Sequence, residues 1–295
     1  MFDFVSHRKI FFLISGGLIL ASIIFLGLWG LNPGIDFTGG TMMEIEYPET
    51  EDFTLLEIRE KLEDFNLGEI KIQKTKTNSF VLRFKDINED THQQVLAALE
   101  NPQEERYESI GPVIGQELKQ KAKWTIILTL LAIIFYIAWA FRKITRITKK
   151  GESWFYGFGA LLALFHDLII LLGFFALWGF LKGAEINTSF ITALLIVLGY
   201  SVNDTIVIYD RIRENILTHQ FKDLSQTINL SLNETIVRSL NTSLTTLFVL
   251  LTIYIFGGES IKDFVLAMMV GIGVGTWSSI VISSQFLLLK RKIKL

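Results

Sequence analysis

Leu198-Gly-Tyr-Ser-Val-Asn-Asp-Thr-Ile-Val-Ile-Tyr-Asp210 places an ionisable side chain, Asp204, inside an apolar run that extends from Phe190 to Asp210. The run is long enough to cross a lipid bilayer as a helix. A carboxylate near the centre of a spanning helix costs roughly 2.5 to 3.5 kcal/mol, so it normally faces protein or water and has a function. The stretch therefore predicts a membrane-spanning helix that carries a buried acid.

Polar side chains accompany Asp204 on this helix. Tyr200, Ser201 and Thr205 lie within one turn of it, and Asn203 is adjacent. Residues one turn apart share a helix face. We therefore expect a polar seam inside a bundle of helices.

The composition is typical of a membrane protein with several spans. Half of the 295 residues are hydrophobic, 24 are Phe, and only 20% are charged. The absence of Cys excludes disulfides, thiolate nucleophiles and Cys-ligated metals, and the four His are scattered. The sequence thus predicts no metal site, no cofactor and no enzyme, and nothing in it suggests nucleic-acid binding.

Six apolar runs are long enough to span a bilayer. The first, from Ile10 to Leu31, follows a short basic start and lacks a convincing cleavage site, so we expect an uncleaved anchor helix. The others are Trp124 to Phe141, Trp154 to Leu181, Asn187 to Asp210, Thr235 to Phe256 and Asp263 to Leu289. An even number of spans places both termini on one side.

Basic residues predict which side that is. They gather at the N-terminus, between Arg142 and Lys150, after Arg211, and at the C-terminus from Lys290 onward. Positive charge favours the cytoplasmic side of a membrane. We therefore expect both termini in the cytoplasm, with residues 32–123 outside.

Residues 32–123 form a polar insert between the anchor helix (1–31) and the remaining spans (124–295). The insert holds 19 acidic and 11 basic side chains. Its pattern predicts strand, helix, two strands, helix and strand, and Thr54-Leu-Leu-Glu57 is a capping box at the first helix. This order predicts a ferredoxin-like α+β domain inserted into a six-helix membrane bundle.

A segment at about 212–234 is less apolar. Leu224, Ile228 and Leu232 recur every fourth position among polar neighbours. This spacing fits an amphipathic helix on the cytoplasmic membrane surface and equally an ordinary helical linker.

The fifth span carries a possible counter-charge for Asp204. Arg238 lies near its cytoplasmic start, and Asn241, Thr242 and Thr245 continue a polar face. Because spans four and five are antiparallel, we expect Asp204 and Arg238 at comparable depth. An ion pair between them would form when Asp204 is ionised and open when it is neutral. The alternative is that Arg238 only anchors its helix at the interface.

Three further features have both a structural and a functional interpretation. Asp167, next to His166 in the third span, belongs either to a polar relay with Asp204 or to a structural hydrogen bond; adjacent helix residues diverge too far to form a metal site. Gly34-Ile-Asp-Phe-Thr-Gly-Gly40 predicts a tight turn before a strand. The candidate functional residues of this motif, at the base of the exterior domain, are Gly34, Asp36, Gly39 and Gly40. A row of small residues in the sixth span predicts close helix packing: Gly271, Gly275, Ser279 and Ser283.

Three separated motifs resemble those of the SecF family of protein-export subunits, in the resistance-nodulation-division (RND) transporter superfamily. They are Gly34 to Gly40, Gly199-Tyr-Ser-Val-Asn-Asp-Thr205 running into Asp210-Arg-Ile-Arg-Glu-Asn215, and Arg238-Ser-Leu-Asn-Thr-Ser243. With six spans and one large exterior loop, the likeness covers nearly the whole chain.

The resemblance implies a function. It implies that Asp204 and Arg238 take part in a cation-coupled step, with H⁺ or Na⁺ as the coupling ion, and that exterior-domain movements help to draw an unfolded polypeptide outward. It implies SecD as partner, the SecYEG channel nearby, and other Sec accessory subunits. The alternatives are half of another RND exporter of small molecules or lipids, for which the exterior loop is small, and a structural assembly subunit.

Overall fold

The computed structural model describes residues 1–48, 53–75, 78–142, 152–219 and 224–292. The chain separates into two compact units. Unit one contains residues 1–31, 124–184 and 189–295, and unit two contains residues 32–123 together with 185–188.

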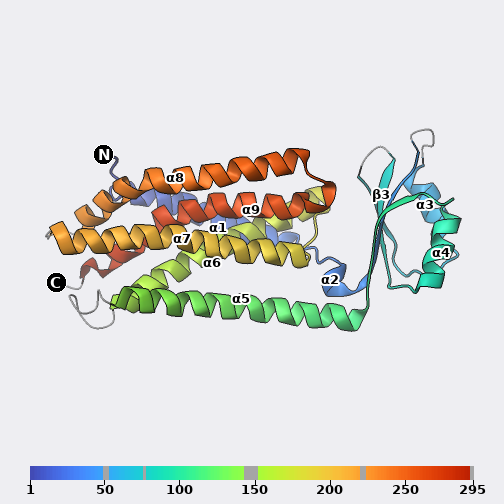
Figure 1. Cartoon of the computed structure of the whole chain (residues 1–295), viewed down its shortest axis with the longest axis horizontal. Helices are drawn as coiled ribbons and strands as arrows, with labels where there is room; N and C mark the ends of the chain where they lie inside the picture. The colour runs from blue at the N-terminus through green and yellow to red at the C-terminus, as the bar shows by residue number, and fades with distance from the viewer. Residues whose placement is uncertain (49–52, 76–77, 143–151, 220–223, 293–295) are drawn as a thin grey trace. The chain divides into compact units, whose positions relative to one another are not determined.

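Unit one is helical (Figure 1). Within the described residues, six helices are long and apolar enough to cross a membrane, as predicted. The long helices are α1 (Arg8–Leu28), α5 (Pro112–Ala140), α6 (Glu152–Lys182), α7 (Thr188–His219), α8 (Leu224–Phe256) and α9 (Glu259–Ser278). A π-helical turn (Ser279–Ser283) and α10 (Ser284–Phe286) continue the last span.

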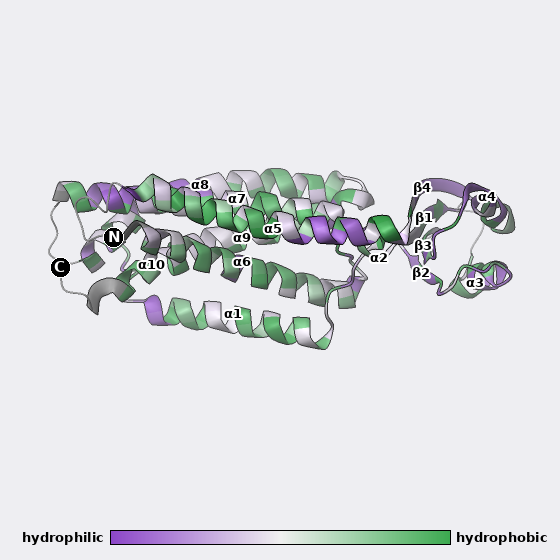
Figure 2. Cartoon of the chain, turned by 90° about the horizontal axis from the view of Figure 1, so that it is seen from below, coloured by the Kyte–Doolittle hydropathy of each residue, from purple (hydrophilic) through white to green (hydrophobic). Residues whose placement is uncertain are grey.

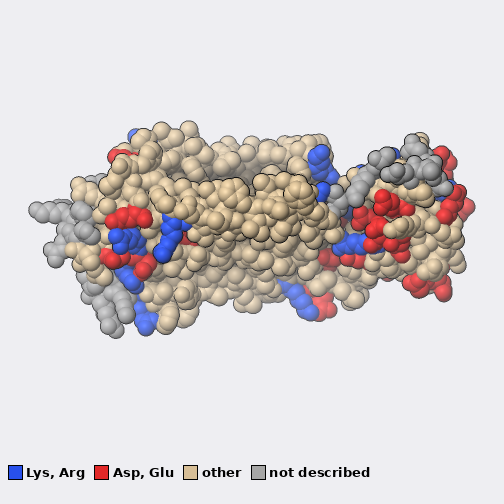
Figure 3. Space-filling model, turned by 45° about the horizontal axis from the view of Figure 1, so that its top comes forward, with Lys and Arg blue, Asp and Glu red and all other residues tan. Residues whose placement is uncertain are grey.

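The surfaces of these helices suit a lipid environment. Figure 2 shows hydrophobic residues along most of their length, with hydrophilic residues just after the first turn of α5. Figure 3 shows a long flank of the helices with few charges. The helices α6, α7 and α9 are the most buried of the six, whereas α1, α5 and α8 are mostly exposed. The buried polar residues therefore concentrate where the three central helices meet their neighbours.

Small residues bring these helices close together. A Cβ added to Gly173 on α6 would lie 2.2 Å from the Cβ of Ser22 on α1. A Cβ added to Gly271 on α9 would lie 2.4 Å from a methyl group of Val197 on α7, and one added to Gly275 would lie 2.8 Å from the Cβ of Ser201. The predicted packing role of the small-residue row in the sixth span is confirmed.

Two helices are longer than the apolar runs indicated. Helix α5 begins at Pro112, well before the predicted start at Trp124. The predicted segment at about 212–234 is not a separate helix in the described residues, because α7 continues to His219 and α8 begins at Leu224. Ile228 and Leu232 are buried on α8, which explains their spacing: they form the packed face of a long helix rather than a membrane-surface helix.

Unit two is an α+β domain. A short helix, α2 (Ile35–Thr38), precedes β1 (Gly40–Glu46), α3 (Leu55–Leu62), β2 (Lys71–Lys74), β3 (Ser79–Phe84), α4 (Glu89–Ala98) and β4 (Gln103–Ile110). All observed strand pairs are antiparallel, and the strand order is β2-β3-β1-β4. The predicted succession of strands and helices is confirmed.

The helices α3 and α4 cover the same face of the sheet (Figure 1). Alternate side chains of the central strands, Met43 and Ile45 on β1 and Phe80 and Leu82 on β3, are buried against both helices. Helix α3 begins with the predicted capping box: Glu57 N donates to the Thr54 hydroxyl, and Thr54 N donates to Glu57 Oε2.

Candidate functional site

Asp167 on α6 lies in a hydrogen-bonded cluster with no exposed surface. Its Oδ2 accepts from the Ser201 hydroxyl on α7 at 2.6 Å and from the Ser278 hydroxyl on α9 at 2.9 Å. Its Oδ1 lies 3.0 Å from Nδ1 of the neighbouring His166. Asp167 therefore joins three helices.

Asp204 on α7 is also buried, with 3% of its surface exposed. The hydroxyls of Thr276 on α9 and Ser239 on α8 lie beside its carboxyl group. Its Oδ2 has no hydrogen-bond partner in the part of the chain that the structure describes. Asp204 thus faces the protein interior, as the sequence predicts, but it is less fully satisfied than Asp167.

Hydroxyl groups connect the surroundings of the two acids. Thr205, next to Asp204, contacts Ser279 at 2.8 Å, and Ser279 donates to the carbonyl of Ser201, which holds Asp167. Ser279 lies in the π-helical turn, a distortion that is frequent at functional sites. The result is a buried polar region of two carboxylates and several hydroxyls, to which α6, α7, α8, α9 and the π-helical turn contribute.

The predicted pair of Asp204 and Arg238 is not formed in this structure. No ion pair joins them among the described residues. Arg238 is exposed on α8. It lines a cavity of about 270 Å³ near the ends of α7 and α8, and the other lining residues are Val207, Asp210, Arg211, Glu214, Glu234 and Thr235.

The other predicted residues of the fifth span share this exposed face. Asn241, Thr242 and Thr245 are exposed, and the two threonines donate to carbonyl groups of their own helix. Asn203 on α7 is exposed as well. The face of α8 that turns toward Asp204 carries Ser239 and Ser243 instead, and Ser243 contacts Thr276 at 2.6 Å.

Sequence reasoning missed the contribution of Ser239, Ser243, Thr276 and Ser278. The spacing of Ser239 and Ser243, one turn apart, was a usable signal because hydroxyl residues at this spacing often connect membrane helices. Thr276 and Ser278 lie between Gly275 and Ser279 of the small-residue row in the sixth span.

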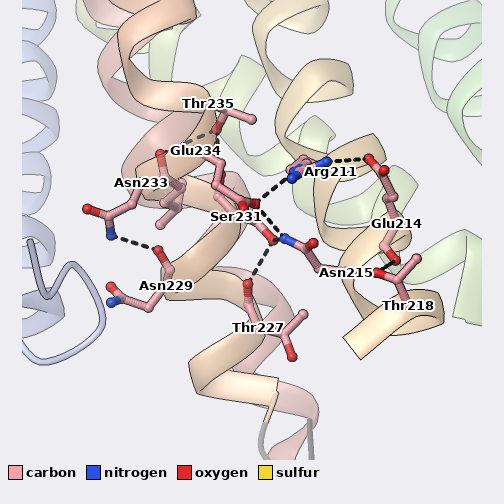
Figure 4. Close-up of polar contacts among 11 residues, drawn as sticks. Arg211, Glu214, Asn215, Thr218, Thr227, Asn229, Ser231, Asn233, Glu234 and Thr235 are labelled. Carbon is pink, nitrogen blue, oxygen red and sulfur yellow. Dashed lines mark hydrogen bonds and ion pairs between the residues drawn. The ribbon is translucent and has the colours of Figure 1, made fainter. Parts of the chain in front are cut away.

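A second polar cluster at the ends of α7 and α8 was also not predicted (Figure 4). Arg211 Nε lies 2.7 Å from Glu234, and its Nη1 lies 2.6 Å from Glu214. The Asn215 side chain donates to Ser231 at 3.0 Å and to Glu234 at 2.8 Å. These contacts fasten α7 to α8 at this end of the helices.

The start of the chain is held against the same part of α8. The Asn233 amide accepts from Phe2 N and donates to Phe2 O, both at 2.8 Å. Asn229 Oδ1 accepts from Phe4 N, also at 2.8 Å. Two asparagines one turn apart therefore hold the backbone that precedes α1.

The predicted turn motif lies in unit two and contains the helix α2. Gly39 and Gly40 have φ values of +75° and +128°, conformations that favour glycine. Asp36 accepts a hydrogen bond from the backbone of Thr188 through its Oδ2, at 2.6 Å. The tight turn before a strand is confirmed, and the carboxylate has a contact far away in sequence.

Buried acids among spanning helices, with one inserted α+β unit, are features of a multi-span membrane transport protein. The chain matches the family model "Protein export membrane protein SecD/SecF, C-terminal" over residues 91–292 and the "SecD/SecF GG Motif" over residues 24–47. The chain belongs to the SecD/SecF family.

Individual relatives show which of the two subunit types, SecD or SecF, this chain resembles. It is 39% identical to the protein translocase subunit SecF of Thermobaculum terrenum, over 97% of this chain and 93% of that protein. It is 37% identical to SecF of Calditerrivibrio nitroreducens, over 99% and 95%. It is therefore a SecF-type protein-export subunit, a transport component and not an enzyme.

Two solved SecDF structures are similar to nearly the whole of this chain. The crystal structure of SecDF from Thermus thermophilus, described as a translocon-associated membrane protein, matches with a TM-score of 0.84 and 30% identity over 99% of this chain. SecDF in a super-membrane-facing form matches with a TM-score of 0.67 and 29% identity. The chain spans 39% of each of these SecDF chains.

Proposed function

We propose that this subunit uses the proton or sodium gradient to promote the export of unfolded polypeptides, working with SecD beside a SecYEG channel. The observation that carries the proposal is the pair of buried carboxylates, Asp204 and Asp167, in one polar region. Such groups are expensive in a membrane and usually mark ion or proton pathways.

Asp204 would be the ion-binding group. A cation or proton on its carboxyl group removes a net charge from the helix interior, and its departure restores that charge. Because Asp204 Oδ2 has no partner among the described residues, it has an acceptor atom available for a proton or ion. The hydroxyls of Ser239 and Thr276 supply further oxygen atoms of the kind that sodium binds.

Asp167 would complete a relay. Its two serine donors and the contact of Ser279 with Thr205 lead from α6 to the helix of Asp204. A change of charge at Asp204 would therefore be felt by helices that Asp167 holds together.

Arg238 would act on the cytoplasmic side of Asp204. It shares its cavity with three acids, Asp210, Glu214 and Glu234. We propose that Arg238 approaches Asp204 in another conformation, when Asp204 is ionised. Asn203, Asn241, Thr242 and Thr245 would support this polar path. The alternative is that Arg238 only anchors its helix.

The proposal includes the setting of the molecule. We infer a bacterial inner-membrane protein with both termini in the cytoplasm and residues 32–123 outside, because basic residues gather near the termini and between spans. We also propose that unit two is ferredoxin-like, which its strand order β2-β3-β1-β4 and two helices on one face support.

The test replaces Asp204 by Asn in the complex with SecD. We expect normal membrane insertion and loss of gradient-dependent export, measured with membrane vesicles under an imposed proton or sodium gradient. Asp90→Asn is the matched control, because Asp90 is an exposed acid on α4 and lies outside the polar region of Asp204 and outside the Arg238 cavity. Unchanged export in Asp204→Asn would refute the proposal. Comparing the two gradients identifies the ion.

A further inference from the structure

The Asp36 loop contacts the first residues of the helix that carries Asp204. Asp36 Oδ2 accepts from Thr188 N at 2.6 Å, and Thr188 is the first residue of α7. This residue pair is 152 positions apart in sequence. A carboxylate at the N-terminus of a helix satisfies a free N–H group and is favoured by the helix dipole.

Backbone hydrogen bonds strengthen the contact. Gly34 N donates to Ile186 O, and Ile186 N donates to Asn32 O, each at 2.8 Å. An added Cβ at Gly34 would lie 3.2 Å from Glu185 Oε2. The residues just before α7 are therefore held along the chain that leaves α1, at a distance that leaves little room for a side chain.

An ion pair ties the same segment to the sheet. Arg83 on β3 places its Nε 2.5 Å from Glu185 Oε1, and both side chains are less than one-fifth exposed. A partly buried pair of this kind is worth more than an exposed one, because solvent screens it less. Residues 185–187 and Thr188, the first residue of α7, thus cluster with unit two, whereas α7 from Ser189 onward belongs to unit one.

The start of α5 is packed against the same loop. A Cβ added to Gly39 would lie 2.8 Å from Pro112 Cα, and one added to Gly115 would lie 2.8 Å from Gly39 N. Pro112 and Gly115 are in the first turn of α5. Gly39 and Gly115 thus permit close packing of the loop against the first turn of α5 within unit two.

We infer that Asp36, Arg83 and Glu185 are positioning residues that hold residues 185–188, the segment leading into α7, within unit two, and that they thereby couple movements of unit two to Asp204 through the helix. We call these three residues and segment 185–188 the clamp. The inference rests on the proposed function. Asp204 follows Thr188 by sixteen residues of one unbroken helix, about 24 Å along its axis. A helix of this kind transmits a displacement of its first turn to the acid, so the clamp would link exterior movement and ion binding in both directions.

The test uses the full chain with SecD in membrane vesicles. Asp36→Ala removes the acceptor, and Arg83→Glu or Glu185→Arg breaks the ion pair. We expect faster hydrogen exchange of the amides at 185–188 and a loss of gradient-driven export of roughly fivefold or more, the lower end of coupling between linked sites. Arg83→Glu combined with Glu185→Arg restores the pair, and we expect it to restore both measurements.

Arg106→Glu is the matched control. It breaks the pair of Arg106 with Glu108 on β4 of the same sheet, away from residues 185–188, and should leave export unchanged. The inference would be overturned if the Asp36, Arg83 or Glu185 variants exchange the amides at 185–188 faster but export normally. It would also be overturned if Arg83→Glu combined with Glu185→Arg does not restore export. If Asp36→Ala does not fold, the double variant Arg83→Glu with Glu185→Arg still tests the inference. Unchanged export in Asp204→Asn, by contrast, would overturn the proposed function itself.

Discussion

Asp167 and Asp204 differ in how completely their carboxyl groups are satisfied. Asp167 accepts from two serines and contacts His166, whereas Asp204 keeps one oxygen without a partner among the described residues. A fully bonded carboxylate suits a fixed structural role, and an incompletely bonded one suits reversible binding. This difference supports the proposed roles, in which Asp204 binds the ion and Asp167 links the surroundings of Asp204 to the neighbouring helices.

Removing one donor from Asp167 should weaken the bundle modestly. We expect Ser278→Ala to lower the free energy of unfolding in detergent by about 1 kcal/mol, the scale of hydrogen bonds between membrane helices. Thr252→Ala is the control, because its hydroxyl is exposed and donates within its own helix. Equal stability of the two variants would show that the Asp167 cluster adds nothing to packing.

The position of a single residue could be predicted where an ionisable side chain stands in an apolar run, because such a side chain must be buried. An acid inside an apolar run must face protein, so the interior position of Asp204 followed from the sequence. The side of α8 that faces Asp204 could not be predicted from the sequence, because this helix is polar on two neighbouring faces. Arg238 and Asn241 marked the more conspicuous face, yet Ser239 and Ser243 point toward Asp204.

Among the elements, α7 and α9 depend on glycine for their close contact. Adding a methyl group at Gly271 would place it 2.4 Å from Val197, whereas Gly273 has nothing within 4 Å. We expect Gly271→Ala to lower the unfolding free energy by about 1 to 3 kcal/mol through overpacking. Gly273→Ala should have little effect. A thermal unfolding comparison of the two variants in detergent checks this.

The capping box of α3 predicts a pH dependence. Hydrogen bonds from the backbone and then the hydroxyl of Thr54 hold the pKa of Glu57 below its ordinary value. Because the folded pKa is the lower one, this stabilisation is complete above the ordinary value and is lost as the pH falls through the folded pKa. We expect Thr54→Ala to destabilise α3 by about 1 kcal/mol at neutral pH.

Hydrogen exchange of residues 55–62 measures this effect. The difference between Thr54→Ala and the unaltered chain should shrink at acidic pH, where Glu57 is protonated in both. Glu57→Gln retains a side-chain acceptor, and its effect should vary less with pH. A difference that is constant with pH would contradict the role of the Glu57 charge.

Element types were predictable because apolar length and periodicity decide them, but element ends were not. Polar residues from Pro112 to Lys123 continue α5 as a helix, since nothing in their composition prevents it. Residues 212–219 extend α7, and residues 224–234 form the beginning of α8, for the same reason. The π-helical turn at Ser279–Ser283 has no sequence signature of its own.

At the scale of the whole molecule, the exposed polar face of α8 is unsuited to lipid. Arg238, Asn241, Thr242 and Thr245 lie on it, and polar residues in spans normally face protein. This chain corresponds to only 39% of a solved SecDF chain. We therefore expect the SecD half to cover this face.

A photoreactive residue at Thr245 should crosslink to SecD in membranes, detected by a shift in mobility of the labelled product. The same residue at Leu128, exposed on the apolar surface of α5, is the comparison. Crosslinking at Leu128 but not at Thr245 would contradict the prediction, because it would place SecD against α5 and not against the polar face of α8.

The backbone of Phe2 and Phe4, held by Asn233 and Asn229, has a practical consequence for handling the protein. A purification tag or fluorescent fusion joined ahead of Met1 would emerge beside these amides and crowd the part of α8 around Asn229 and Asn233. Recombinant versions should carry such additions at the other terminus, where they leave this backbone tether undisturbed.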